Sequence, residues 1–151
     1  MIEEKLKELG ITIPEAPKPL AAYIPALVDS KLVYTAGQLP VSAGELKFKG
    51  KLGEALGEEE GSKAAELCAI NCLSVIKSVT GSLDNIERII KLTVFVNSAA
   101  GFTAQPKVAN GASELMVTLF GENGKHVRSA VGVSELPLNA ACEVEMIAKI
   151  K

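Results

Sequence analysis

The sequence contains no tryptophan and few other aromatic residues. Four Phe and two Tyr are spread over 151 residues, so no platform of aromatic side chains is available on which nucleic-acid bases could stack. The 16 basic and 18 acidic residues give a net charge of -2, and no run of lysine or arginine forms a stripe that could follow a phosphate backbone. Nucleic acid is therefore not expected as a partner.

Histidine and cysteine are also scarce. His126 is the only histidine, which excludes mechanisms that need two imidazoles. It follows the turn "ENGK", and no serine stands out as its nucleophile, so we interpret it as a solvated residue without a catalytic role. Cys68 and Cys72 lie one helical turn apart on an apolar stripe, with no further ligand at a suitable spacing. Both are interpreted as small buried hydrophobes, and no metal site is predicted.

No signal segment and no membrane-spanning segment are recognisable. The first ten residues, MIEEKLKELG, are charged and predict one or two turns of amphipathic helix. No apolar run approaches the roughly 20 residues that cross a bilayer. Together with three cysteines and no CxxC pair, this favours a protein of the reducing cytoplasm without a membrane anchor.

Apolar material, by contrast, is plentiful. Hydrophobic residues make up 48% of the chain and charged residues 23%, which suits a packed core and excludes disorder. The length fits one domain, and the composition does not change abruptly. We expect a single domain over residues 1–151 with a short N-terminal extension over about residues 1–20.

The spacing of apolar residues predicts two helices among several strands. Spacings of three and four indicate helices, alternation indicates strands, and four prolines make residues 11–25 extended. The predicted elements are a hairpin over 26–41 turning at 29–30, a short strand at 45–49, a helix over 59–80, a strand over 85–98, a helix within 101–121, and strands over 127–133 and 141–150.

This order of elements fits an α+β domain, with one mixed β-sheet and two helices packed on one face. The other face is only partly polar, because Glu143 and Glu145 share it with Ile147 on the last strand. A sheet covered on one side only is suited to burial against copies of itself. A homo-oligomer is therefore expected.

The stretch 127–137, VRSAVGVSELP, carries the strongest signal for a site. As a strand it places Arg128, Ala130 and Gly132 on one face, so a guanidinium stands beside a hollow left by two small residues. Glu143, on the strand interpreted as its neighbour, is also off the apolar face. A guanidinium that grips a carboxylate, beside a carboxylate that takes a proton from water, suits a small anionic substrate. A solvated or cross-strand paired arginine explains the pattern equally well.

Three stretches together resemble the RidA/YjgF family of imine and enamine deaminases, also called the L-PSP endoribonuclease family: YTAGQLPV, KLTVFVNS and VRSAVGVSELPLNAACEVEMIAKI. The resemblance implies a chorismate-mutase-like fold and a homotrimer with one site in each cleft between subunits. It implies a 2-iminobutanoate/2-iminopropanoate deaminase-like hydrolase that converts 2-imino or 2-enamino acids to 2-oxo acids and ammonia. The substrate would be a small carboxylic acid, and no metal or organic cofactor would be needed.

The resemblance also assigns roles to particular residues. Arg128 matches the arginine that binds the substrate carboxylate, and Glu143 matches the glutamate that orients the attacking water. Tyr23 matches a tyrosine that lines the cleft, and Gly37 a glycine whose backbone approaches the substrate. Ala130 stands where the family presents a backbone carbonyl to the imine nitrogen or the water.

Three positions depart from the pattern of active members. Ala36 stands where many of them have a serine, and Ala130 replaces the common cysteine. The asparagine of the second helix matches Gln105, Pro106 or Asn110, depending on the alignment. The alternative function is therefore a non-catalytic module that binds a small carboxylate or 2-oxo acid, and an endoribonuclease ranks last.

Overall fold

The computed structural model describes residues 1–18 and 22–151, and every helix and strand predicted above is present. The elements in chain order are α1 (Ile2–Glu8), β1 (Ala26–Asp29), β2 (Leu32–Thr35), β3 (Val41–Ser42), β4 (Glu45–Leu46), α2 (Glu58–Thr80), η1 (Leu83–Asn85), β5 (Ile86–Asn97), α3 (Gln105–Phe120), η2 (Gly121–Gly124), β6 (Val127–Val133), η3 (Pro137–Asn139) and β7 (Cys142–Ile150).

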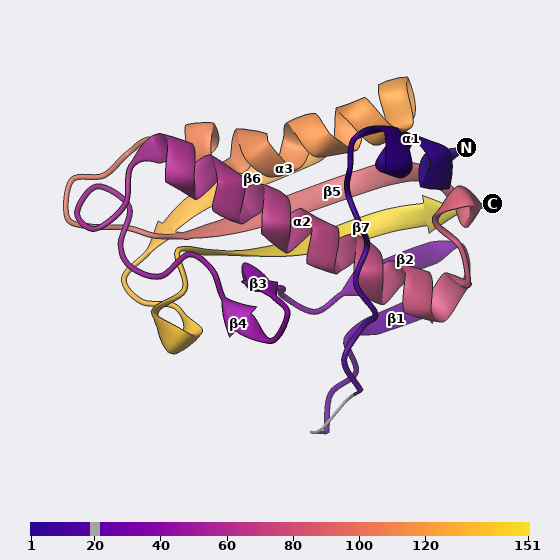
Figure 1. Ribbon diagram of the computed structural model, residues 1–151, viewed down its shortest axis with the longest axis horizontal. Helices are drawn as coiled ribbons and strands as arrows, with labels where there is room; N and C mark the ends of the chain where they lie inside the picture. Colours follow the sequence, from indigo (N-terminus) through magenta and orange to yellow (C-terminus); the bar gives the residue numbers. More distant parts are fainter. Residues whose placement is uncertain (19–21) are drawn as a thin grey trace.

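The main sheet has five strands in the order β1-β2-β7-β5-β6. β5 and β6 are parallel, whereas the other neighbouring pairs are antiparallel. The long helices α2 and α3 lie side by side over one face of this sheet (Figure 1), and the short α1 packs against α3. The prediction of an α+β domain with one mixed sheet and two helices on one face is confirmed.

The core lies between the sheet and the two long helices. Leu92, Val94 and Val96 of β5 are fully buried beside the apolar face of β7. Cys68 and Cys72 are fully buried in the same layer, and burial raises the pKa of the Cys72 thiol to about 12. The interpretation of both cysteines as buried hydrophobes is confirmed, and thiols with so high a pKa are inert.

A glycine sets the distance between the two long helices. Gly111 of α3 lies directly against the backbone of Ser62 in α2, and a Cβ at this position would overlap the Ser62 carbonyl. The close approach fixes where α3 lies along the sheet. It thereby determines which side chains of α3 face strand β6.

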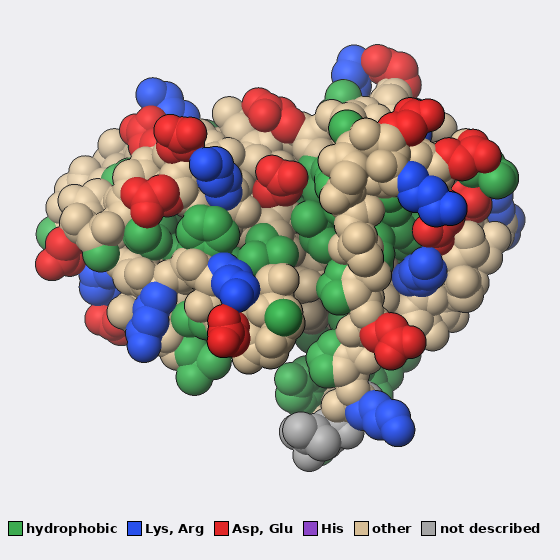
Figure 2. Space-filling view, in the orientation of Figure 1, with side chains coloured by type: hydrophobic (Ala, Val, Ile, Leu, Met, Phe, Trp, Pro, Cys, Tyr) green, Lys and Arg blue, Asp and Glu red, His purple; other side chains and the backbone are tan. Residues whose placement is uncertain are grey.

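The N-terminal extension packs onto the domain in its described part, residues 1–18. The segment after α1 crosses α2 (Figure 1), where the Ser74 hydroxyl donates a 2.6 Å hydrogen bond to the Pro14 carbonyl. Lys77 of α2 forms a 3.0 Å ion pair with Glu3. Figure 2 shows acidic and basic side chains mixed over this face of the molecule. Among the described residues, no helix is long and apolar enough to cross a membrane.

The opposite face of the sheet has no helix over it. Strand pairing places Leu27 and Tyr34 on this face together with Ile147, and Val127 and Val131 of β6 lie on the same side. The four exposed members of this group leave 38% to 65% of their surface in contact with solvent. We call this helix-free side the open face of the sheet.

Candidate functional site

Arg128 is held by helix α3. Strand β6 places it beside Leu92 of β5, so its side chain lies on the helix-covered side of the sheet. Its Nη1 donates to Asn110 Oδ1 at 2.9 Å and to Ser113 Oγ at 3.1 Å, and its Nη2 donates to the Pro106 carbonyl at 3.4 Å. The arginine is neither freely solvated nor paired across strands, because all three partners are on α3.

These contacts leave one edge of the guanidinium available. An arginine side chain carries five N–H donors, and three of them are used in the bonds to α3. Across residues 1–18 and 22–151, Nε and the second N–H of Nη2 have no hydrogen-bond partner. This pair of donors matches the two oxygens of a carboxylate side by side.

The contact with Asn110 shows which helix residue accompanies the arginine. Of the three possible counterparts of the family's asparagine, only Asn110 contacts the guanidinium through its side chain. The Gln105 amide instead donates to the Phe102 carbonyl at 2.8 Å. Residues 106, 110 and 113 are spaced by four and three, which puts them on one helix face. This spacing is the feature of the sequence that could have grouped them as partners of one side chain.

The hollow predicted beside Arg128 is filled by the chain itself. Ala130 packs against the hydrophobic core. At Gly132 a Cβ would lie 2.7 Å from Gln105 Nε2 and 3.0 Å from Ser98 Oγ. The prediction of an open hollow was wrong, because the small residues of β6 make room for α3 rather than for a ligand.

Glu143 and Gly37 form a second cluster, on the open face. Glu143 lies on β7 between two buried residues and is paired with Phe95 of β5. Two backbone hydrogen bonds of 2.8 and 3.0 Å join Gln38 to Val144, which brings Gly37 against the glutamate. A Cβ at Gly37 would overlap the Glu143 carboxylate. Only glycine permits this contact.

The Glu143 carboxyl group is more basic than an ordinary glutamate. Partial burial raises its pKa, and the neighbouring charge of Glu145 raises it further. Within the described part of the chain its carboxylate has no hydrogen-bond donor and no ion-pair partner. A carboxylate that is desolvated without a cationic partner is suited to accept a proton from water.

Ala36 lies at the end of β2 that leads to Gly37. The Ala36 amide donates a 2.8 Å hydrogen bond to the Pro25 carbonyl, and the Ala36 carbonyl accepts from Gln38 Nε2 at 3.2 Å. Tyr23, two residues before Pro25, is 67% exposed. Ala36, next to Gly37 in the chain, therefore lies beside the Glu143 cluster and not beside Arg128.

Arg128 and Glu143 do not meet within one chain. Strand β5 lies between β6 and β7, and the two side chains lie on opposite faces of the sheet. Two strand spacings alone amount to roughly 10 Å. The expectation that Glu143 lies on the strand next to Arg128 was wrong, because β6 pairs in parallel with β5.

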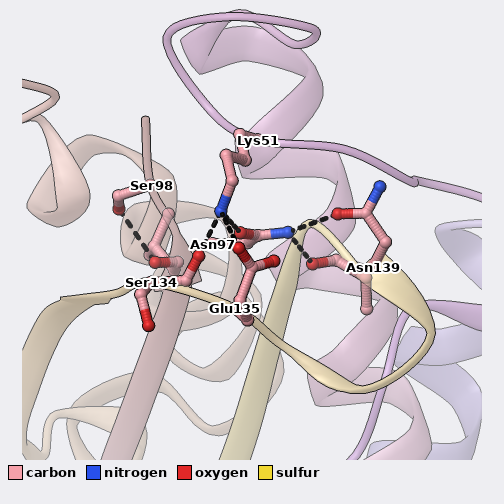
Figure 3. A network of polar contacts seen from close by, with 8 residues as sticks. Lys51, Asn97, Ser98, Ser134, Glu135 and Asn139 are labelled. Atoms are coloured by element: carbon pink, nitrogen blue, oxygen red, sulfur yellow. Dashed lines mark hydrogen bonds and ion pairs between the residues drawn. The ribbon is translucent and has the colours of Figure 1, made fainter. Parts of the chain in front are cut away.

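Sequence reasoning also missed a polar cluster at the far end of β5 (Figure 3). Lys51 Nζ donates to Asn97 Oδ1 at 3.0 Å and to the Ser134 carbonyl, and it pairs with Glu135 at 3.3 Å. The fully buried Asn97 donates to Asn139 Oδ1 at 2.9 Å. The cluster ties the loop before α2 to the loop that leads into β7. In the sequence, the only indication of this cluster was Asn97, a polar residue at the end of an apolar strand.

His126 has a serine partner after all. Its Nε2 lies 2.9 Å from Ser113 Oγ, and its Nδ1 lies 2.6 Å from the Gly124 carbonyl. A carbonyl can only accept, so Nδ1 carries the proton and Nε2 accepts from the Ser113 hydroxyl. Burial lowers the pKa of His126, and the nearby charge of Arg128 lowers it further. The interpretation of His126 as a solvated turn residue without a serine partner was wrong.

Comparison with known proteins agrees with this fold. Residues 3–150 match the sequence model of the family described as "YjgF/chorismate_mutase-like, putative endoribonuclease", and the chain belongs to this family. Protein TCP17 of Trypanosoma cruzi is 40% identical over 99% of this chain and 94% of its own length.

Two solved structures are similar over nearly the whole chain. Protein Atu1372 of Agrobacterium tumefaciens, described as of unknown function, is 43% identical with a TM-score of 0.92, and the match covers 99% of this chain and 92% of that one. A Shewanella oneidensis protein with an endoribonuclease description is 31% identical with a TM-score of 0.95, over 99% of both chains. Both matches include the N-terminal extension, so the extension is shared with these relatives.

Proposed function

We propose that the protein hydrolyses reactive 2-imino and 2-enamino acids to 2-oxo acids and ammonia. The observation that carries this proposal is the environment of the Arg128 guanidinium. Three hydrogen bonds hold it against α3, while Nε and one N–H of Nη2 have no partner among the described residues. Such an edge binds a carboxylate through two parallel hydrogen bonds. The resemblance to imine and enamine deaminases stated above is the reason for proposing the carboxylate of an imino acid as the ligand.

The chemistry needs few groups. Arg128 fixes the substrate carboxylate, which orients the electrophilic C2 carbon of the iminium form. Glu143 accepts a proton from a water molecule as the water oxygen bonds to C2. Glu143 then returns this proton to the amino group of the tetrahedral intermediate. The C–N bond breaks as the hydroxyl oxygen forms the C=O bond and gives up its proton to solvent, which releases ammonia and leaves the 2-oxo acid. The reaction consumes one water and requires no metal or organic cofactor.

The proposed site takes its residues from two copies of the chain. Because Arg128 and Glu143 lie on opposite faces of one sheet, a small substrate reaches both only if they belong to neighbouring subunits. Arg128 is on β6, the edge strand of the sheet, where a second copy can approach. We therefore propose a homotrimer whose open faces are turned inward, which would bury exposed Leu27 and Tyr34.

The test is an assay of imine lifetime. An amino-acid oxidase or a dehydratase generates the imine, and semicarbazide trapping and ammonia release are followed with and without the protein. We expect the protein to lower the trapped imine and accelerate ammonia release, and Arg128→Ala to abolish both effects. Arg88→Ala is the matched control, since among residues 1–18 and 22–151 Arg88 donates to the Lys125 carbonyl alone. Equal imine lifetimes with and without the protein would refute the proposal.

Ala36 supports one alternative, a module that binds a small carboxylate without turnover, because a methyl group replaces the hydroxyl at this position. In that case pyruvate would bind through Arg128 while the imine lifetime stayed unchanged. An endoribonuclease ranks below both, given a single histidine and a net charge of -2. We also propose a cytoplasmic location without nucleic-acid or membrane partners, consistent with three free, buried cysteines.

A further inference from the structure

A continuous chain of hydrogen bonds leads from the sole histidine to the proposed anion site. The Gly124 carbonyl accepts from His126 Nδ1, His126 Nε2 accepts from the Ser113 hydroxyl, and Ser113 Oγ accepts from Arg128 Nη1. The three distances are 2.6, 2.9 and 3.1 Å. Every donor in this chain meets an acceptor, provided that the imidazole is neutral.

This series of hydrogen bonds constrains Arg128 more than a single contact would. With Asn110 on one N–H of Nη1 and Ser113 on the other, the guanidinium plane cannot rotate without breaking a hydrogen bond. The Ser113 hydroxyl can point its lone pair at Arg128 because its own proton is directed to His126. The imidazole therefore sets the orientation of the serine, and the serine sets that of the arginine.

We propose that Ser113 and His126 are positioning residues for the Arg128 carboxylate site, and that they couple carboxylate binding to proton uptake by His126. The proposal rests on the proposed function, since it takes Arg128 as the residue that receives the substrate carboxylate. It assigns roles to two side chains that the imine hydrolysis itself does not use.

The sign of the coupling follows from linkage. In the free protein the guanidinium charge disfavours a second positive charge on His126. A bound carboxylate neutralises that charge, so the pKa of His126 rises on binding. When His126 takes up a proton, Nε2 becomes a donor, and the two lone pairs of Ser113 Oγ can accept from Nε2 and from Arg128 Nη1, so Arg128 stays in place. Because coupling between two ligands is reciprocal, the carboxylate binds more tightly below the pKa of His126 than above it.

Other charged groups near His126 are already engaged or exposed. Glu122 of η2 pairs with Lys125 at 2.8 Å, and Arg88 of β5 donates to the Lys125 carbonyl. Glu114 beside Ser113 is exposed to solvent, and Lys91 of β5 is paired in register with Val127 on the open face. Arg128 is thus the charge that acts on the pKa of the imidazole.

The single histidine makes the test direct. In tag-free protein the imidazole proton signals belong to His126 alone, so an NMR titration gives its pKa without assignment. The titration is run with and without saturating pyruvate in Glu143→Gln, which removes the titration of Glu143. We expect a pKa below the usual value of about 6.5 in the free protein and a higher pKa in the complex. Identical pKa values in both states would overturn the coupling.

Two substitutions separate positioning from mere packing. Ser113→Ala should weaken pyruvate binding by about three- to tenfold and reduce the pKa response of His126, whereas Thr118→Ala on the exposed side of α3 should change neither. His126→Gln retains an acceptor for Ser113 and cannot take up the proton. It should bind pyruvate as the parent does at pH 8 and lack the tighter binding at pH 5.

The outcomes also distinguish this inference from the proposed function. If Arg128→Ala leaves pyruvate binding unchanged, Arg128 is not the carboxylate ligand and the proposed function fails. If Arg128→Ala abolishes binding while Ser113→Ala and His126→Gln keep the parent affinity and pH dependence, only the inference fails. Pyruvate is a suitable probe because its carboxyl group stays ionised throughout pH 5 to 8.

Discussion

The two halves of the proposed site differ in how much of their environment comes from their own chain. Arg128 has three partners on α3 and is positioned before any ligand or second subunit arrives. Glu143 has Gly37 against it, and burial raises its pKa while no cation of the described residues pairs with its carboxylate. The arginine half is complete within one chain, whereas the glutamate half lacks a partner for its charge.

This difference indicates what each half contributes. A preorganised guanidinium binds a carboxylate at little cost in reorganisation. An unpaired, basic carboxylate is unfavourable for folding but suited to proton transfer. We infer that the raised pKa of Glu143 lowers the stability of the fold slightly and serves proton transfer. We also infer that Arg128 of the neighbouring copy lies near this carboxylate.

The largest expected effect is the loss of the arginine half. Arg128→Ala should reduce accelerated imine hydrolysis by about ten- to a hundredfold, since a charge-assisted carboxylate pair is worth roughly 1.5–3 kcal/mol. Arg128→Lys should lose most of the activity too, because an ammonium group lacks the planar fork. Steady-state rates and thermal melts on the same samples check this. A large fall in Tm with normal turnover would show that Arg128 only supports the fold.

A comparable test acts on the glutamate half through Gly37. In Gly37→Ala the added methyl group would overlap the Glu143 carboxylate, so the side chain must move. The carboxylate is the end of a flexible side chain and can turn aside at little cost in stability, so we expect a loss of turnover with the fold and pyruvate binding retained. Chemical denaturation and pyruvate titration are the measurements. Ala36→Gly, at the adjacent residue, is the control and should leave Glu143 in place.

A smaller effect is expected at the Lys51 cluster, which lies outside both halves. Asn97→Ala would remove the side-chain donor to the buried Ala140 carbonyl and to Asn139, and one acceptor of Lys51, which costs about 1–3 kcal/mol of stability. Because the cluster holds the loop before β7, catalysis should fall only modestly. The free energy of unfolding is measured by denaturant titration for both variants. Asn97→Ala removes the whole amide, whereas Asn97→Asp keeps an oxygen that accepts from Lys51. Unchanged stability in Asn97→Ala would contradict this role.

The smallest effect concerns stability and pH at Glu143. Its folded pKa is raised, so the folded state holds this proton to higher pH than the unfolded state does. The contribution to stability is present at low pH and is lost as pH rises through the folded pKa. In the Arg128→Ala background, which removes the neighbouring guanidinium, Glu143→Gln should therefore match its parent near pH 4 and exceed its Tm near pH 7. The exposed Glu145→Gln is the comparison, and a lower Tm for Glu143→Gln at pH 7 would contradict this account.

Periodicity predicted the elements and the identity of several buried residues, because these depend on local spacing. It could not predict the strand order, which is set by pairing between residues far apart in sequence. The alternation of Arg128, Ala130 and Gly132 on β6 was correct, but the parallel pairing of β6 with β5 puts this face under α3. Glu143 consequently lies on the other side, although the sequence suggested one compact site.

The same limit explains the missed contacts of α3. Asn110 and Ser113 share a helix face by their spacing, yet nothing local indicates that this face meets Arg128. His126 is 13 residues from Ser113, and the turn around it suggested exposure. The resemblance to the family identified Arg128 and Glu143 as residues of interest, whereas their separation within one chain required the fold.

The central claim is that the site combines Arg128 of one subunit with Glu143 of another. The direct measurement mixes Arg128→Ala and Glu143→Gln, each inactive alone, after joint unfolding and reassembly. Random trimers with interfacial sites should regain about a quarter of the wild-type activity, because about three quarters of the trimers are mixed and each mixed trimer contains one intact site out of three. A mixture that remains as inactive as its two components would contradict the shared site.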